Sequence, residues 1–235
     1  MRTKALILVC LMLIIPVAAR AADSDSAATR TIVVDGSGEA QATPDTASLN
    51  LAIQTTGRTA AQASGANADL ASKVVAALKS KLGDKGTVST GGYSLNPEYD
   101  QRPGREHPSI VGYTAQNSIT VETGQLDLVG ELIDAAIGAG ANSVNYLNFS
   151  LKNDADARAK AITMATHDAR EQAQALADAL GVKLGKIVKA TTVSEPQPIR
   201  MERPMMAMAK MSAPTPVEPG QVSVSASVTL TYEIE

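Results

Sequence analysis

The chain has 235 residues, of which 21 are Lys or Arg and 24 are Asp or Glu, so its formal net charge is −3. A net acidic chain is repelled by phosphate backbones and by anionic lipid, which argues against nucleic acid as a partner. Only 3% of the residues are aromatic and Trp is absent, so few rings are available to stack on single-stranded bases.

The first 21 residues predict a cleavable signal peptide. A short basic start, Met1 to Lys4, precedes an apolar run from Ala5 to Ala18, and Ala19-Arg20-Ala21 fits a signal-peptidase site. The alternative is an uncleaved membrane anchor, but a spanning helix needs about 20 apolar residues and this run is shorter. We therefore expect a periplasmic protein with no integral membrane span. Peripheral association with the envelope, including the outer membrane, stays open.

Loss of the signal changes the charge and the cysteine content. Residues 1–21 contain three basic residues, no acidic residue and the only cysteine, so the net charge falls from −3 to −6. Cys10 lies behind Val9, where a lipoprotein signal needs a small residue, and lipid anchoring is therefore not expected. The mature chain has no thiol for a disulfide, so its stability must come from a hydrophobic core.

After the signal, residues 22–29 predict a flexible tether and residues 30–235 predict one domain. Thr31 to Val34 is predicted as a first strand, which ends in a Gly36-Ser37-Gly38 turn. This glycine pair is not a dinucleotide-binding loop, because it lacks a third glycine and precedes a strand rather than a helix.

The residues after Asp45 predict a split β-α-β unit, in which two helices cover one face of an antiparallel sheet. Alternating apolar residues mark the strands, three- and four-residue spacing marks the helices, and Thr59 with Gln62 fits a helix N-cap. A polar loop containing Pro97, Pro103 and Pro108 is expected between the second and third strands. The elements in order β-α-β-β-α-β are expected at about 47–54, 59–82, 87–95, 111–121, 125–137 and 144–151.

The rest of the chain predicts a long alanine-rich helix, from Asn153 or Asp154 to Leu180, and two further strands at 184–193 and 222–234. A Pro- and Met-rich loop at 195–220 separates these strands, and the fold class is α+β. Alanine stabilises a packed helix, but its small side chain also lets another copy approach, so packing and self-assembly both remain open. Whether this helix or a neighbouring copy covers the second face of the sheet is also left open.

No group of reactive side chains is evident. The two histidines, His107 in the Pro-rich loop and His167 in the long helix, lie far apart in the sequence, and no Gly-x-Ser-x-Gly segment is present. We therefore predict no catalytic residue, no cofactor and no enzymatic activity. A hydrolase that uses His107 or His167 is the remaining enzymatic alternative.

Five methionines crowd the Pro- and Met-rich loop. Thioethers outside the reducing cytoplasm are suitable ligands for Cu(I), and they can also absorb oxidants. A third interpretation is a flap that packs adaptably, because a methionine run without His or Cys specifies no metal geometry. The candidate Cu(I) ligands are Met201, Met205, Met206, Met208 and Met211.

Several short segments, taken in their order and spacing, match a known family. They are Val34 to Gly38, Pro44 to Ala47, Gly140-Ala141, Leu180 to Gly185, and the alternating residues Val222 to Tyr232. In these segments the chain resembles the SIMPL-domain family, also called DUF541, which includes periplasmic and outer-membrane-associated immunogenic proteins of Gram-negative bacteria. The resemblance covers nearly all of residues 30–235.

This resemblance implies a soluble exported α+β protein, with large ring-like homo-oligomers in some relatives and a link to oxidative stress tolerance in others. It supplies no catalytic residue, because the family has no established reaction. We therefore expect a non-enzymatic envelope protein that self-assembles and has a role in oxidative stress tolerance. A periplasmic protein that binds Cu(I) or another ligand through Met201 to Met211 is the alternative.

Overall fold

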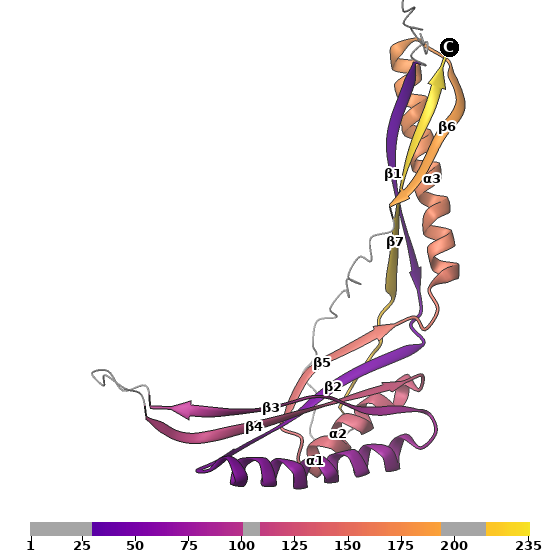
Figure 1. The fold of residues 1–235 in the computed structure, drawn as a ribbon. Helices are drawn as coiled ribbons and strands as arrows, with labels where there is room; N and C mark the ends of the chain where they lie inside the picture. The colour runs from indigo at the N-terminus through magenta and orange to yellow at the C-terminus, as the bar shows by residue number, and fades with distance from the viewer. Residues whose placement is uncertain (1–29, 101–108, 194–214) are drawn as a thin grey trace, which may run out of the picture.

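The structure, a computed structural model, describes residues 30–100, 109–193 and 215–235. Within these residues two antiparallel sheets and three α-helices form two parts that meet at one end, giving the L shape in Figure 1. This confirms the predicted α+β class. In chain order the elements are β1 (Thr31–Ala42), β2 (Thr46–Gly57), α1 (Ala60–Leu82), β3 (Gly86–Tyr99), β4 (Ile110–Thr123), the 3-10 helix η1 (Leu126–Leu128), α2 (Val129–Ala139), β5 (Ser143–Ser150), α3 (Ala155–Leu180), β6 (Leu184–Val193) and β7 (Val222–Ile234).

The split β-α-β unit is present as predicted. Its sheet has the order β3-β4-β2-β5, all neighbours are antiparallel, and α1 and α2 lie on the same side of it (Figure 1). Helix α1 starts where expected, because the Thr59 hydroxyl accepts the Gln62 backbone N–H at 3.2 Å. It ends at Gly83, whose φ of 58° suits glycine.

The first hydrophobic core lies between this sheet and its two helices. Alternate residues of β2, Leu49, Leu51 and Ile53, point toward α1 and α2, whose buried side chains include Val74 and Leu132. Burial of such side chains contributes about 1.5–3 kcal/mol each, so this layer stabilises the sheet strongly. Its fully or almost fully buried large members are Leu49, Leu51, Ile53, Val74, Leu78, Leu82, Ile119, Val121, Val129 and Leu132.

The second sheet has the order β1-β7-β6 and packs against α3. The predicted turn at Gly36-Ser37-Gly38 is wrong, because β1 runs without interruption through these residues and pairs with β7 along its whole length. The glycines have a different function: they let α3 approach. A Cβ added at Gly36 would lie 2.1 Å from the carbonyl oxygen of Ala165, and one at Gly38 would lie 2.2 Å from that of Ala161.

The buried face of α3 consists of alanines at four-residue spacing. Four residues exceed one helical turn of 3.6, so this row winds around the helix and follows the twist of the β1–β7 pair beneath it. Toward the C-terminal end of α3, the second core is completed by Ile32 and Val34 of β1 and by Leu230 of β7. The buried alanines are Ala157, Ala161, Ala165, Ala169, Ala173 and Ala177.

Strand β3 is longer than predicted. It continues to Tyr99 and includes Pro97, where the sequence suggested a loop. Proline is tolerated there because β3 is an edge strand and its outward N–H groups pair with no other strand among the described residues. The predicted loop around Pro103 and Pro108 falls on residues 101–108, outside the described part of the chain.

Helix α3 does not cover the second face of the four-stranded sheet. It contacts β1 and β7 instead, and none of the described helices lies on that second face (Figure 1). The alternative left open by the sequence is therefore settled against α3. The predicted division into signal (1–21), tether (22–29) and one domain (30–235) stays a prediction, because residues 1–29 lie outside the described part.

The two sheets are connected where the chain passes between them. At the first passage the Asp45 backbone N–H donates to the Ser150 carbonyl at 3.1 Å, and the Asp45 carboxylate accepts the Lys152 N–H at 2.7 Å. Residues 43–45 lead from β1 to β2, and residues 151–154 lead from β5 to α3. Asp45 therefore links, by hydrogen bonds, two segments through which the chain passes from one sheet to the other.

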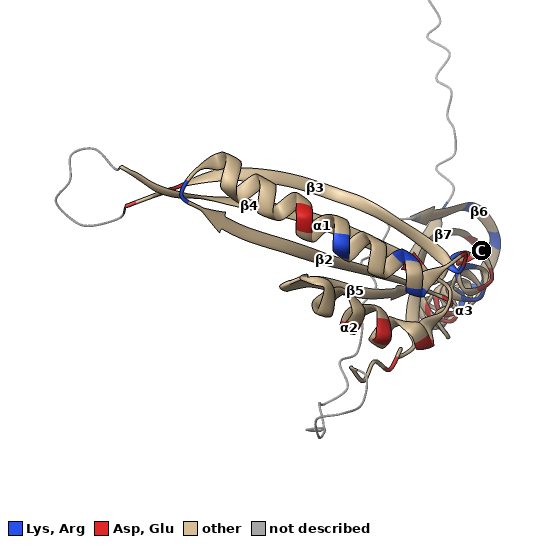
Figure 2. Ribbon diagram, turned by 90° about the horizontal axis from the view of Figure 1, so that it is seen from below, with Lys and Arg blue, Asp and Glu red and all other residues tan. Residues whose placement is uncertain are grey.

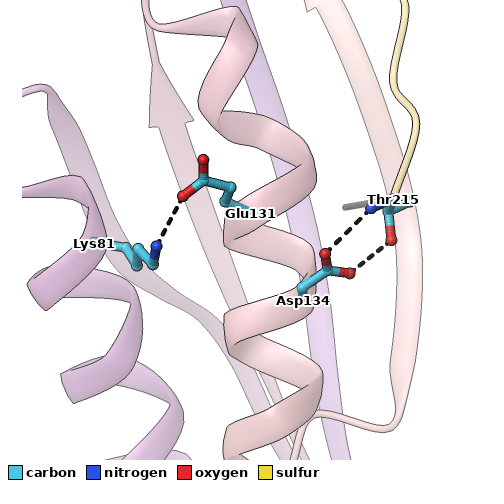
Figure 3. A network of polar contacts seen from close by, with 4 residues as sticks. All are labelled: Lys81, Glu131, Asp134 and Thr215. Atoms are coloured by element: carbon cyan, nitrogen blue, oxygen red, sulfur yellow. Dashed lines mark hydrogen bonds and ion pairs between the residues drawn. The ribbon is translucent and has the colours of Figure 1, made fainter. Parts of the chain in front are cut away.

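A further contact fastens the segment before β7. Thr215 donates its backbone N–H at 3.1 Å and its hydroxyl at 2.7 Å to the Asp134 carboxylate of α2 (Figure 3). Gly130 makes the approach possible, since a Cβ there would lie 2.4 Å from the Thr215 carbonyl oxygen. Nearby, the Lys81–Glu131 ion pair of 2.7 Å joins α1 to α2 (Figure 3).

Two carboxylates that accept hydrogen bonds from backbone N–H groups, Asp45 from Lys152 and Asp168 from Ser37, make the stability of the protein depend on pH. The Lys152 backbone N–H and then the Thr46 hydroxyl hold the pKa of Asp45 below its usual value. The Ser37 backbone N–H and then the Gln172 amide do the same to the pKa of Asp168. A pKa lowered by folding gives stability that is present above the unfolded pKa and lost as the pH falls through the folded pKa.

We therefore expect the wild-type protein to lose stability below about pH 4. The double variant Asp45→Asn, Asp168→Asn should lose less over the same range, because asparagine has no charge to lose. Urea midpoints at pH 7 and pH 3 test this. Equal losses in the two proteins would show that other groups control the acid sensitivity.

Candidate functional site

Of the residues that the sequence analysis named as candidates for catalysis or metal binding, the described part of the chain contains only His167. His167 lies on the surface of α3, and its Nδ1 is 3.5 Å from the Glu171 carboxylate one turn later. No group of three His, Cys, Asp or Glu residues suited to a metal occurs among the described residues. His107 and the candidate ligands Met201, Met205, Met206, Met208 and Met211 lie outside the described residues, so the structure does not test them.

Among the residues that the structure describes, the β3–β4 hairpin carries the largest set of exposed apolar side chains. It projects away from the rest of the molecule (Figure 1), and Tyr93, Tyr99 and Val111 are each at least half exposed. We call this set the hairpin patch. It consists of Tyr93, Leu95, Tyr99, Ile110 and Val111.

The position of α1 explains the exposure of the hairpin patch. Leu95 of β3 lies opposite Ala115 of β4 and therefore shares its face of the sheet. Ala115 is completely buried, whereas Leu95 is 36% exposed. The helices thus cover β2 and β4 and leave the edge strand β3 largely uncovered.

A second exposed apolar row follows one side of α3. Met164, Leu176 and Leu180 are spaced by multiples of four residues and share that side with Asp168. Asp168 accepts the Ser37 N–H of β1 at 2.8 Å, so this side of the helix lies along the unpaired edge of β1. We call Met164, Leu176 and Leu180 the α3 flank.

The uncovered face of the four-stranded sheet is polar but almost uncharged. Charged residues lie on α1 and α2 (Figure 2), whereas within β2 to β5 only Glu98 and Glu122 are charged. Near the centre of this face, Asn50 donates to the Thr120 hydroxyl at 2.8 Å and accepts from the Asn145 amide at 2.6 Å. Asn50 is only 8% exposed, so its side chain is held in one orientation.

Sequence reasoning missed these three surfaces. A signal for the hairpin patch was available, because three of the five tyrosines in the chain, Tyr93, Tyr99 and Tyr113, lie in or beside one predicted loop. The Asn50 group had no signal, because its members come from three strands that only the sheet brings together.

Comparison with known proteins places the chain in a family. The model of the SIMPL family, described as a protein of unknown function (DUF541), matches residues 32–232. The chain belongs to the SIMPL family. The match starts in β1 and ends in β7, so this SIMPL protein uses both sheets as parts of the family fold.

The relatives of this SIMPL protein are not named as enzymes. A 26 kDa periplasmic immunogenic protein of Brucella melitensis is 32% identical over 211 residues, which cover 87% of this chain and 84% of the relative. An uncharacterised protein, YggE, of Escherichia coli K12 is 28% identical over 206 residues, which cover 87% and 83%.

Among solved structures, AtUAH in complex with glyoxylate matches with a TM-score of 0.27 and 12% identity, over 59% of this chain and 35% of that chain. This likeness is too slight to bear on the fold or the function of the SIMPL protein.

Among the described residues, no helix is both long and apolar enough to cross a membrane.

Proposed function

We propose that this protein is a non-enzymatic periplasmic protein of the cell envelope that works by assembling with copies of itself. The hairpin patch is the main support for the proposal. The relatives named as periplasmic immunogenic proteins support the location, and the predicted signal peptide agrees with it. A role in oxidative stress tolerance, which the family resemblance implies, is part of the same proposal.

The hairpin patch is unusual for an isolated soluble chain. Single exposed apolar residues are common, but contiguous groups mark interaction sites. Tyr93 and Tyr99 combine a large apolar ring with a hydroxyl that still binds water, a combination enriched at protein interfaces. The hairpin therefore has the composition of a contact surface.

The α3 flank is the surface that we propose for the other side of the contact. It lies on the upright part of the L, away from the hairpin (Figure 1). Two different surfaces of one chain make a head-to-tail contact, which generates a closed ring or an open filament depending on the rotation between copies.

This proposal predicts that polar changes in either surface lower the molar mass of the assembly. The variants are Tyr93→Ser with Val111→Ser in the hairpin patch, and Leu176→Gln with Leu180→Gln in the α3 flank. We expect each to release smaller species at a concentration where the wild type is assembled, because each removes apolar area from the contact. Light scattering coupled to size-exclusion chromatography measures the mass.

The matched control is Ser80→Gln on the exposed side of α1, which should leave the mass unchanged. A wild type that stays monomeric at high concentration contradicts the proposal. A wild type that assembles equally well after both pairs of changes contradicts the choice of surfaces.

The alternative function, Cu(I) or ligand binding through Met201 to Met211, stays a prediction. These residues lie outside the described part of the chain, and no described residue favours the alternative.

A further inference from the structure

The uncovered face of the four-stranded sheet has an unusual composition. Its central side chains form four rows across the strands, and each row consists of register neighbours. A further row of Asn96, Thr114 and Thr56 lies toward the hairpin tip, where Glu98 follows on the same face. Glu122 is the only charged residue in the four central rows, although 19% of the whole chain is charged. The four central rows are Thr87, Glu122, Ser48 and Asn148; Ser89, Thr120, Asn50 and Tyr146; Gly92, Ser118, Ala52 and Ser143; and Ser94, Gln116 and Gln54.

A pre-ordered polar group lies in the second row. Asn145 is the extra residue at the irregularity between β2 and β5, and this position lets its amide reach Asn50. The Thr120 hydroxyl accepts a hydrogen bond from Asn50, so its own hydrogen points elsewhere and is available to another acceptor. The second N–H of the Asn50 amide is not used in these two hydrogen bonds.

Gly91 leaves the Thr120 hydroxyl and the edge of the 8% exposed Asn50 amide without a side chain over them on the β3 side. It is the extra residue at a register shift in β3, and a Cβ there would lie 3.1 Å from the Thr120 hydroxyl oxygen and 3.5 Å from the Asn50 amide nitrogen. Any larger side chain would extend over both. On the other side, Tyr146 lies directly opposite Asn50 and is 49% exposed.

We propose that this face binds an uncharged glycan strand, with the Asn50, Thr120 and Tyr146 side chains as its centre. A sugar ring offers hydroxyl groups at its edge and an apolar C–H face. The amide and hydroxyl groups match the edge because each can donate and accept, and the tyrosine ring offers an apolar surface for the C–H face. The near absence of charge favours a neutral polymer over nucleic acid, lipid headgroups or a charged peptide.

A second copy is the competing occupant of this face. The face lacks the large apolar side chains that an interface between copies needs at its centre, since Tyr146 is the only one in the four rows. In a contact between copies, each hydroxyl and amide group of this face would lose its bound water and would need a hydrogen-bond partner on the other copy. The observations therefore favour the glycan, and assembly through this face is an outcome that the test below detects.

The experiment titrates N-acetylated chitotetraose, a soluble neutral tetrasaccharide, into the mature protein by isothermal calorimetry. We expect weak saturable binding by the wild type. Tyr146→Ala should weaken it about tenfold because the stacking surface is lost. Gly91→Val should abolish it, because the added side chain covers Asn50 and Thr120.

The matched control is Tyr93→Ala, a similarly exposed tyrosine on the opposite face of the same sheet. It should bind the sugar like the wild type, because a soluble tetrasaccharide binds each subunit independently of assembly. Circular dichroism confirms that each variant is folded.

Three results would overturn the proposal: no saturable binding by the wild type, equal binding by all folded variants, or equal weakening by Tyr93→Ala. Light scattering on Tyr146→Ala distinguishes a glycan from a second copy of the chain as the occupant of this face. A lowered molar mass would assign the face to contacts between copies. Loss of sugar binding at unchanged mass supports the glycan, whatever the outcome for the hairpin patch.

Discussion

Replacing Gly36 with alanine is expected to destabilise the protein by about 3 kcal/mol. The new Cβ would lie 2.1 Å from the Ala165 carbonyl oxygen and 2.5 Å from the Ala169 backbone nitrogen. Both are backbone atoms of α3, so no side-chain rotation relieves the overlap and the whole helix must move away from β1. That movement also separates the alanine row from Ile32, Val34 and Leu230 within the second core. Urea unfolding of the two proteins measures the difference.

Gly65→Ala is the matched control for this prediction. Gly65 lies inside α1, and a Cβ added there meets no atom within 4 Å. The same chemical change should therefore stabilise the protein by about 0.5–1 kcal/mol, because alanine favours the helix more than glycine does. If the two substitutions had similar effects, close approach of α3 would not be the reason for glycine at position 36.

The second large effect is expected from truncating one residue of each core. Leu51 of β2 is completely buried in the first core, and Leu230 of β7 is 3% exposed in the second. Replacement by alanine should cost about 2–5 kcal/mol at each site, from the lost apolar contacts and the cavity left behind. Val33→Ala is the control, because Val33 is 59% exposed and its loss should change stability by less than about 0.5 kcal/mol.

The same pair of variants tests the prediction that residues 30–235 form one domain. If the Asp45 and Thr215 contacts couple the two sheets, Leu51→Ala and Leu230→Ala should each lower a single unfolding transition, with equal midpoints by circular dichroism and by tyrosine fluorescence. Two separate transitions, each shifted by only one of the variants, would show that the cores unfold independently and would refute the prediction.

Periodicity in the sequence predicts the elements of this protein well, because each long helix and strand repeats its own pattern. The alternation of Val228, Leu230 and Tyr232 and the N-cap at Thr59 appear in the structure as predicted. The errors occur where a residue acts through a distant partner. Gly36 and Gly38 resemble a turn in sequence, and only α3, more than a hundred residues later, explains why they lack side chains.

The candidate surfaces show the same limit. Tyr93 and Leu95 alternate like core residues, and they are exposed because α1 packs mainly on β2 and β4 and covers little of the edge strand at these positions. Asn50, Thr120 and Asn145 are ordinary polar positions of three separate strands. Their hydrogen bonds depend on the sheet order and on the register shift beside Asn50, neither of which a local pattern encodes.

The sequence by itself determined the α+β class, the order of helices and strands, and the family, since local spacing of apolar residues and short motifs are sufficient for each. Tertiary structure decided that the chain forms two sheets rather than one layer, that α3 covers β1 and β7, and that one face of the four-stranded sheet stays open. The physical reason is that a helix buries its apolar side against whichever surface fits most closely. The alanines of α3 fit the glycines of β1, and that match is visible only when both are in place.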